Sequence, residues 1–311
     1  MKAAQIRDYG TSEVIEIRDI EKPSLKTNQV LVEVKAASLN PVDYKLPSGM
    51  LKDYMPLTFP ATLGGDFSGV ITEIGEGVSD YKVGDEVFGS ALTLNGGSGS
   101  LAQFAASNTQ NMALKPKTID FTQAASLPLV GASAIQAIEE HINLQKGQKI
   151  LIQGGAGGIG SIAVQLSKMH GAFVAATAAS EDVEFVKGLG ADQVIDYKSE
   201  DFSEILKDFD AVYDTVGGEV TDKSFKVLKK GGILVSMVGQ PNEELAKQYE
   251  AVAIGQGTKT TSEKLKHLAQ LVDSGKIKPQ VDKIFPLEQI KEAFGFFEKV
   301  HPRGKVVVSI E

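Results

Sequence analysis

Residues 154–160 read Gly-Gly-Ala-Gly-Gly-Ile-Gly, in which Gly155, Gly157 and Gly160 have the spacing Gly-x-Gly-x-x-Gly. An apolar run at 149–153 precedes this motif, and residues 161–169 follow it with helical periodicity. A strand–turn–helix unit of this kind needs glycine for a tight turn, for backbone approach to a pyrophosphate and for close helix–strand packing. Exposed N–H groups and the helix dipole then hold the phosphates. The motif therefore predicts a dinucleotide site rather than an ordinary glycine-rich turn.

The composition of the 311 residues is that of a globular protein of about two domains. A formal net charge of −8 without a basic run argues against nucleic acid or an anionic membrane as the main partner. No apolar segment is long enough to span a bilayer, and residues 1–7 look like a first strand rather than a signal peptide. The absence of cysteine excludes disulfides and thiolate ligands. We expect a cytoplasmic protein.

Two kinds of pattern divide the chain. Residues 1–121 hold short strand-like runs interrupted by glycine, proline, asparagine and aspartate, for example at 30–34, 67–74 and 86–88. These runs predict an antiparallel, partly open β-barrel. From 122 to 285 strands and helices alternate, with buried strands expected at 172–178, 193–195, 211–215 and 233–238. This alternation predicts an α/β domain with a doubly wound parallel Rossmann sheet.

The C-terminal residues return to the first pattern, with an amphipathic helix expected at 289–300 and a strand at 305–310. A terminal strand that rejoins the first domain makes that domain discontinuous, with residues 1–121 and 286–311 in one domain and 122–285 in the other. The glycine- and serine-rich residues 95–100 suggest a mobile hairpin tip, or else a flap over a site. Residues 243–261 are not assigned to an element.

Six further motifs occur in order along the chain. They are Asn-Pro-Val-Asp-Tyr-Lys at 40–45, Gly-Gly-Asp-Phe-Ser-Gly-Val at 64–70, Val-Gly-Asp-Glu-Val-Phe-Gly at 83–89, Ala-Ala-Ser-Leu-Pro-Leu at 124–129, Leu-Gly-Ala-Asp at 189–192 and Arg-Gly-Lys-Val-Val-Val at 303–308. With the glycine turn, this set resembles the zinc-free quinone oxidoreductase branch of the medium-chain dehydrogenase/reductase superfamily, including its enone and alkenal reductases. The resemblance spans essentially the whole chain. It implies a GroES-like catalytic domain, a Rossmann domain, a nicotinamide cofactor in the cleft between them, and a homodimer.

A zinc site is not expected. Zinc-dependent relatives hold their catalytic metal with cysteine and histidine, but Asn40 stands at the position of the first ligand. Gly-Gly-Asp at 64–66 replaces a Gly-His-Glu motif, and the four histidines are dispersed without ligand spacing. Without a Lewis acid, the mechanism of a zinc alcohol dehydrogenase has no means of polarising the substrate oxygen. The chemistry that fits is hydride transfer to an already electrophilic carbon, in a quinone or an α,β-unsaturated carbonyl compound.

The resemblance places residues 40–45 beside the nicotinamide. Asn40 would supply an amide N–H and Lys45 a cation near the substrate oxygen, while Tyr44 and Tyr54 would give apolar walls with hydroxyl tips. The alternative is structural: Asn-Pro opens a turn, Asp43 caps the next helical turn, Lys45 is solvated and the aromatic rings are packed. No residue is identified as the proton donor, and water can fill that role.

The cofactor's identity depends on the end of the second Rossmann strand, where an NAD enzyme usually carries an acid. This chain has Ala-Ala-Ser at 178–180, so NADPH is favoured over NADH. The resemblance implies that Ser180 and Tyr197 contact the 2′-phosphate, although Ser180 is also a good helix N-cap. Many NADPH-dependent members have a basic residue where this chain has Val183. Lys198 and Lys187 are the candidates to supply that positive charge instead.

Further cofactor contacts carry over from the resemblance, with plain turn chemistry as the alternative. They are the backbone N–H groups of Ala156, Gly157, Gly158 and Ile159, the side chain of Ser133, and the strand ends at Thr215, Val216, Val238 and Gly239. Together these residues predict an NADPH-dependent oxidoreductase that acts on small-molecule quinones or enones. A non-catalytic NADPH-binding protein with a structural or redox-sensing role is the alternative.

Overall fold

The computed structural model describes residues 1–310, and the chain divides into two compact units. Unit 1 comprises residues 1–129, 260–274 and 279–310, and unit 2 comprises residues 130–259 and 275–278. Unit 1 extends beyond residue 121, where the sequence analysis placed the boundary, because helix α2 (Phe121–Ala125) packs against strands β3 (Gln29–Ser38) and β5 (Asp66–Ile74). Helix α9 (Ser262–Asp273) also belongs to unit 1 and packs against strand β8 (Met112–Leu114).

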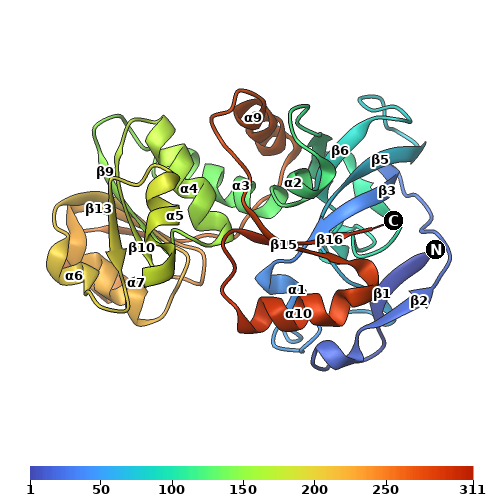
Figure 1. Cartoon of the computed structure of the whole chain (residues 1–311), viewed down its shortest axis with the longest axis horizontal. Helices are drawn as coiled ribbons and strands as arrows, with labels where there is room; N and C mark the ends of the chain where they lie inside the picture. The colour runs from blue at the N-terminus through green and yellow to red at the C-terminus, as the bar shows by residue number, and fades with distance from the viewer. Residues whose placement is uncertain (311) are drawn as a thin grey trace. The chain divides into compact units, whose positions relative to one another are not determined.

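Unit 1 is built on two sheets of mostly antiparallel strands (Figure 1). The smaller sheet has the order β2-β1-β4, with β2 at Glu16–Asp19, β1 at Lys2–Ile6 and β4 at Ala61–Thr62. The larger sheet has the order β15-β16-β3-β5-β6-β8, and β7 pairs with β3 outside this path. Its other strands are β15 (Val281–Pro286), β16 (Lys305–Ser309), β6 (Glu86–Ser90) and β7 (Phe104–Asn108). This path does not close on itself, so the sheet is open, and the chain's last strand β16 lies beside β3.

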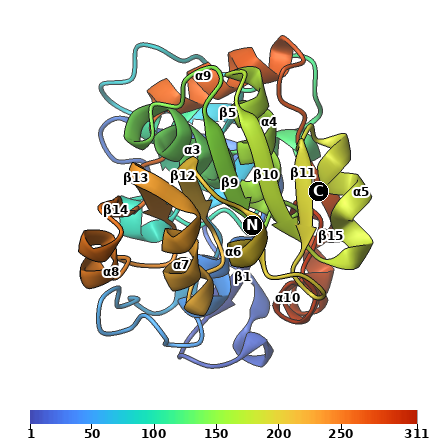
Figure 2. The same cartoon turned by 90° about the vertical axis from the view of Figure 1, so that its left-hand side faces the viewer.

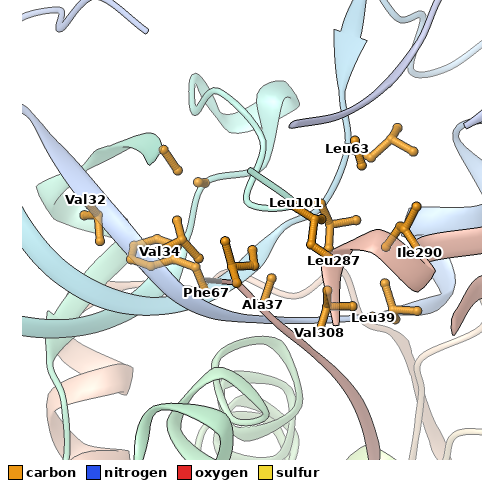
Figure 3. Close-up of a cluster of buried hydrophobic side chains, with 14 of the residues drawn as sticks. Val32, Val34, Ala37, Leu39, Leu63, Phe67, Leu101, Leu287, Ile290 and Val308 are labelled. Atoms are coloured by element: carbon orange, nitrogen blue, oxygen red, sulfur yellow. The ribbon is translucent and has the colours of Figure 1, made fainter. Parts of the chain in front are cut away.

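The core of unit 1 lies against the inner face of the larger sheet (Figure 3). Val30, Val32 and Val34 alternate along β3 and are all buried, as expected for a strand with one face in a core. Helix α10 (Ile290–Lys299) adds Ile290 and Phe294 to the same cluster. Burial of apolar surface stabilises a fold by about 25 cal/mol per Å². This burial holds the sheet and α10 together.

Residues 95–100 form a packed loop, which differs from the mobile tip or flap expected from their composition. The Ser98 hydroxyl accepts the Ala106 N–H at 2.8 Å, and the Gly99 N–H donates to the Ala91 carbonyl at 2.8 Å. A Cβ atom at Gly97 would lie 2.2 Å from the Ala91 oxygen, so only glycine fits there. The glycines in this loop allow close backbone packing.

Unit 2 contains one sheet of six parallel strands in the order β11-β10-β9-β12-β13-β14 (Figure 2). The strands are β9 (Lys149–Gln153), β10 (Phe173–Ala178), β11 (Gln193–Asp196), β12 (Phe209–Asp214), β13 (Leu228–Ser236) and β14 (Val252–Gly255). The order runs outward in both directions from β9, which makes β9 and β12 the switch point of a doubly wound sheet. The α/β fold predicted from the sequence is confirmed, and β14 is the strand that lay unassigned within residues 243–261.

Helices connect the strands of unit 2, and helix α4 follows the glycine turn. These connections are α4 (Gly158–Met169), α5 (Val183–Gly188), α6 (Phe202–Ile205), α7 (Glu219–Ser224) and α8 (Glu243–Gln248). Helix α3 (Pro128–Ile135) continues into a π-helical turn at Gln136–His141, and helix α1 (Pro41–Lys45) lies in unit 1. Helix α4 buries Ile162, Ala163, Val164 and Leu166, which lie around most of its circumference, as expected for a helix surrounded by protein.

Short 3₁₀ helices occur at Ser12–Val14, Thr93–Asn95, Thr109–Asn111, Ser180–Asp182, Phe225–Val227 and Leu287–Gln289. Among residues 1–310, no helix combines the length and the apolar composition needed to cross a membrane.

Candidate functional site

The glycine turn between β9 and α4 is fixed by Thr177 on the neighbouring strand β10. The Gly154 N–H donates to the Thr177 hydroxyl at 3.0 Å, and the Gly155 N–H donates to the Thr177 carbonyl at 2.8 Å. The same hydroxyl donates to the Gln153 side chain at 2.7 Å. Gly157 then caps helix α4, which runs for 12 residues. The backbone of the turn is thus held by strand β10 before any ligand binds.

The three glycines of the motif have different surroundings. A Cβ atom at Gly160 would lie 2.1 Å from the Gly154 oxygen, and one at Gly155 would lie 2.9 Å from the Ala176 Cβ, so both are required for packing. A Cβ atom at Gly157 would meet only the Gly154 oxygen, at an ordinary 3.5 Å. The position beside Gly157 is therefore open, and the missing side chain leaves room for a group that approaches the first N–H groups of α4. A pyrophosphate fits this cradle.

A buried carboxylate shapes the turn after β12, where Thr215 and Val216 are predicted contacts. Asp214 is fully buried, and its Oδ1 accepts the N–H groups of Val216 at 2.9 Å and Gly217 at 3.1 Å. Its Oδ2 accepts the hydroxyls of Thr221 at 2.5 Å and of Ser236 at 3.1 Å.

The predicted apolar contacts Val216 and Val238 are both about half exposed, at 51% and 50%. Val238 and Gly239 follow strand β13, and the Val238 N–H donates to the Ser236 hydroxyl at 3.2 Å. These residues lie after the carboxyl ends of β12 and β13, where an open α/β sheet binds ligands.

Ser133, another predicted cofactor contact, is completely buried. Its hydroxyl lies 2.7 Å from the Thr258 hydroxyl, and its carbonyl accepts hydrogen bonds from Tyr213 at 3.2 Å and Gln256 at 3.0 Å. Burial raises the pKa of Tyr213, so this hydroxyl stays protonated and serves as a donor. In this structure the Ser133 side chain links helix α3 to the segment after β14.

Ser180 and Tyr197 lie at the ends of the paired strands β10 and β11. The Ser180 hydroxyl donates to Asp196 at 2.5 Å, and the Tyr197 N–H donates to the Ala178 carbonyl at 3.1 Å. The side chain of Tyr197 is 53% exposed. Lys198 contacts both carboxylate oxygens of Glu181 at 2.8 Å. The structure therefore brings Ser180 and Tyr197 together with two carboxylates and one ammonium group.

In unit 1, the segment at residues 40–45 begins helix α1, and Asn40 is its buried N-cap. The Asn40 side-chain nitrogen donates to Asp66 at 2.9 Å, and its side-chain oxygen accepts the Lys305 ammonium at 2.6 Å. The Asn40 N–H donates to the Asp43 carboxylate at 2.7 Å. We call Asn40, Asp43, Asp66 and Lys305 the buried charge cluster, since all four are at most 4% exposed.

The charges of this cluster do not balance, because it holds two carboxyl groups and one ammonium. Burial raises the pKa of Asp43, the Asn40 N–H and Lys305 lower it, and the nearby Asp66 raises it, so that the pKa lies at about 7 instead of 3.8. Burial also raises the pKa of Asp66 and lowers that of Lys305. Within residues 1–310, the Asp43 Oδ1 has no hydrogen-bond partner. One carboxyl group of the cluster is therefore poised to take up a proton near neutral pH.

Tyr44 and Lys45 follow on the same helix, and Tyr54 lies in the loop after it. Tyr44 is partly buried, packs edge-on against Phe297 at 6.1 Å and lines a cavity of about 300 Å³ together with Met50. Lys45 is partly exposed, and among the described residues its ammonium has no carboxylate partner. Tyr54 is 87% exposed. Asn40 thus caps α1, and Tyr44 and Lys45 lie at its end; the side chains of Asn40 and Tyr44 contact different parts of unit 1.

The sequence analysis did not identify Lys305 or Asp66 as members of this cluster. Their signal was present: Lys305 begins the last strand and directly precedes the apolar run Val-Val-Val at 306–308. A charged residue at the start of a buried strand calls for a buried partner, and Asp66 begins strand β5.

Comparison with known proteins shows which families the chain resembles. The family described as alcohol dehydrogenase GroES-like domain matches residues 26–117, and the family described as zinc-binding dehydrogenase matches residues 189–308. A protein of Arabidopsis thaliana named NADPH-dependent alkenal/one oxidoreductase, chloroplastic, is 40% identical over 321 residues, which cover 99% of this chain and 79% of the relative. The 2-methylene-furan-3-one reductase of Solanum lycopersicum is 39% identical over 319 residues, with the same coverage of 99% and 79%.

A solved structure gives the same result. The quinone oxidoreductase from Coxiella burnetii superimposes with a TM-score of 0.90 at 35% identity, and the match covers 100% of this chain and 99% of that one. The chain therefore belongs to the medium-chain dehydrogenase/reductase superfamily, in its branch of quinone oxidoreductases and alkenal/enone reductases.

Proposed function

We propose that this protein is an NADPH-dependent reductase that transfers a hydride to quinones or to α,β-unsaturated carbonyl compounds. The observation that carries the proposal is the open position beside Gly157, at the start of a 12-residue helix and on a turn already fixed by Thr177. The names of relatives that match 99% of the chain support the substrate class and NADPH. Bound NADPH would supply a hydride from its reduced nicotinamide ring.

In unit 2, most of the residues that would hold NADPH follow the carboxyl ends of strands β9 to β13. The N–H groups of residues 156–159 would bind the pyrophosphate at the start of α4, where the helix dipole favours negative charge. Val216 and Val238, each half exposed, offer apolar contact area. Ser180 and Tyr197 would contact the adenosine ribose and its phosphate. Ser133 supports the chain near the end of α3.

In unit 1, we assign the groups that act on the substrate to helix α1 and the loop after it. Lys45 would place its ammonium near the substrate oxygen, where negative charge develops when the hydride adds to the far carbon. Water would then protonate the product. Asn40 stays a predicted donor through its second amide hydrogen, because Asp66 accepts only one. Tyr44 and Tyr54 are the predicted walls of the substrate site.

The residues present do not fit a catalytic zinc ion. The Asn40 side-chain oxygen, at the position of a zinc ligand in zinc-dependent relatives, already accepts the buried Lys305 ammonium at 2.6 Å. The sequence has no cysteine, and among residues 1–310 no group of three or more histidine or acidic side chains could hold a metal. We therefore propose a zinc-free reaction, which suits acceptors that are electrophilic without a Lewis acid.

The test measures the oxidation of NADPH through the loss of absorbance of its reduced nicotinamide ring. NADH is assayed in parallel. The acceptors are a small quinone, a short enone or alkenal, and a saturated ketone, each with and without a chelator. Turnover of the quinone or the enone but not the ketone, unaffected by the chelator, supports the proposal. Reduction of the ketone, or loss of activity with the chelator, overturns it. Tight NADPH binding without turnover of any acceptor identifies a non-catalytic binding protein instead.

We also propose a homodimer in the cytoplasm. The edge strand β14 exposes Val252 at 52%, and such a strand can pair with a second copy. The absence of cysteine suits a reducing compartment. Sedimentation of the purified chain and fractionation of the source cells test these two points.

A further inference from the structure

We propose that Lys305 is a positioning residue for the proposed reaction, which together with Asp66 fixes the orientation of the Asn40 amide. In this orientation Asn40 presents an N–H group, and not its oxygen, to the substrate. This rests on the proposed function, because the substrate group that such a donor selects is an acceptor oxygen, as in an enone carbonyl or a quinone. Lys305 then acts on the substrate through Asn40.

The larger sheet of unit 1 brings the three side chains together. Strand β16 pairs with β3 so that Val307 lies opposite Ser38, and the same register carried two residues further puts Lys305 opposite Asn40. On the other side of β3, strand β5 places Asp66 opposite Ser38. Side chains on neighbouring strands at such positions contact one another. The order β16-β3-β5 therefore sets an ammonium, an amide and a carboxyl group in one row.

Each end of the Asn40 amide has a partner of one kind only. The Lys305 ammonium donates to the Asn40 oxygen at 2.6 Å, and the Asn40 nitrogen donates to the Asp66 Oδ2 at 2.9 Å. An ammonium can only donate. The Asp66 Oδ2 also accepts the Leu129 N–H at 3.2 Å, so it is an acceptor here. An amide turned end for end would set donor against donor and acceptor against acceptor, and would lose both hydrogen bonds.

The Lys305 ammonium is itself held in place. It also donates to the Leu39 carbonyl at 2.5 Å, and the Lys305 backbone N–H donates to the Gln280 carbonyl at 3.0 Å. Burial lowers the pKa of Lys305, while Asp66 and Asp43 raise it. The two carboxyl groups thus favour the charged form, which has only hydrogens to offer. Since Lys305 is 4% exposed, water does not compete for its hydrogen bond to the amide.

A fixed donor has a consequence for the substrate. Asp66 takes one hydrogen of the Asn40 nitrogen, so the second is left for the substrate. A donor whose direction is set beforehand stabilises an oxygen on which negative charge develops, without reorganisation during the reaction. The oxygen of an enone or a quinone is of this kind. An amide that could turn would offer its oxygen to an alcohol hydroxyl equally well, so the fixed orientation favours carbonyl substrates.

The first experiment is a double-mutant cycle between residues 305 and 40, measured as kcat/KM for NADPH-dependent reduction of an enone at pH 6. At this pH Asp43, whose pKa is about 7, holds its proton, which limits the charge left by Lys305→Met. We expect Asn40→Ala to lower kcat/KM about 10²-fold. Lys305→Met should lower it about tenfold, through kcat rather than KM. In the Asn40→Ala background, Lys305→Met should change kcat/KM by less than about twofold, because Lys305 acts through Asn40.

Two more variants separate positioning from stability. Lys305→Gln keeps an N–H that can donate to the Asn40 oxygen, so it should retain more activity than Lys305→Met, and it takes the place of Lys305→Met in the cycle if that variant does not fold. The control Lys35→Met removes a lysine of β3 that pairs with Glu33 at 2.6 Å, and it should leave kcat/KM unchanged. Losses that add up in the cycle overturn the inference, since a purely structural effect of Lys305 would persist without the Asn40 amide.

The second experiment needs no turnover. In protein labelled with ¹⁵N at asparagine, the Asn40 side-chain signals are those that disappear in Asn40→Ala. We expect their hydrogens to exchange with deuterated water more slowly than those of the exposed Asn28, and Lys305→Gln to speed up this exchange. Exchange as fast as at Asn28 in the wild type overturns the fixed amide. A wild type that reduces neither enone nor quinone overturns the proposed function and the role of Lys305 in it, and slow exchange then shows that the fixed amide serves the fold alone.

Discussion

The buried charge cluster predicts that protonation of Asp43 stabilises unit 1. The carboxyl has a pKa of about 7 in the folded protein and an ordinary value of 3.8 in the unfolded chain. Between these values the folded state binds the proton and the unfolded state does not, so the free energy of unfolding falls as the pH rises. The slope is about 1.4 kcal/mol per pH unit. From pH 5 to pH 8 the expected loss is about 2 to 3 kcal/mol.

Replacement of Asp43 by asparagine removes this dependence. Asparagine keeps an oxygen that accepts the Asn40 N–H, as the carboxylate does at 2.7 Å, but it carries no charge. We expect the difference in unfolding free energy between Asp43→Asn and the wild type to shift by about 2 to 3 kcal/mol in favour of the variant from pH 5 to pH 8.

The assay is urea unfolding at pH 5 and pH 8, with Asp53→Asn as a control at an exposed position of the same unit. The comparison depends only on the change with pH, so a constant offset from the new amide does not affect it. An equal difference between variant and wild type at the two pH values would refute the reasoning, since Asp43 would then titrate alike in both states.

Four further predictions concern packing, charge and phosphate binding. Lys305→Met leaves two buried carboxyl groups without a cation and should cost about 3 to 5 kcal/mol at pH 8, measured by urea unfolding. The control Lys35→Met removes a partly exposed ion pair with Glu33 and should cost under about 1 kcal/mol. Equal costs would contradict this account. Gly160→Ala should destabilise unit 2 by about 1 to 3 kcal/mol, because its Cβ would lie 2.1 Å from a carbonyl oxygen. Gly157→Ala should leave the melting temperature nearly unchanged and weaken NADPH binding, as measured by calorimetry; unaltered binding would show that no phosphate lies there. Asp214→Ala leaves four donors without their acceptor, two of them the buried hydroxyls of Thr221 and Ser236. It should cost at least about 2 kcal/mol in thermal unfolding, and an unchanged stability would show that water replaces the carboxylate.

Sequence patterns predicted those elements of the structure whose local sequence preference matches the conformation that they adopt in the fold. The glycine turn and the alternation of strands and helices in unit 2 were of this kind, because the glycine spacing, the apolar run before it and the helical periodicity after it all indicate one strand–turn–helix unit. Strand β14 was missed since it has four residues and follows a helix of six. The loop at 95–100 was misjudged because composition cannot distinguish a glycine that confers mobility from one, such as Gly97, that permits backbone contact.

The candidate site shows more clearly that local patterns in the sequence do not predict contacts between distant residues. Asn40, Tyr44 and Lys45 are neighbours in the sequence, and the structural alternative stated for residues 40–45, a turn followed by a capped helical turn, agrees with α1 and its N-cap Asn40. Lys305 lies 265 residues beyond Asn40, and only the pairing of β16 with β3 brings it to the cluster. No local pattern encodes that pairing, which arises from the fold of unit 1 as a whole.

The buried charge cluster also changes how pH dependence of the proposed reaction should be understood. Asp43 accepts the Asn40 N–H at the first turn of α1, and Lys45 lies two residues further along the same helix. When Asp43 loses its proton, the new charge acts on Asn40 and Lys305 rather than on the substrate, since Asp43 is 2% exposed. A change of activity near pH 7 would therefore reflect the positioning of α1, and not the titration of a group that donates a proton. Because Asp43→Asn removes the titrating group and keeps the hydrogen bond, the variant should flatten such a profile while the enzyme still turns over.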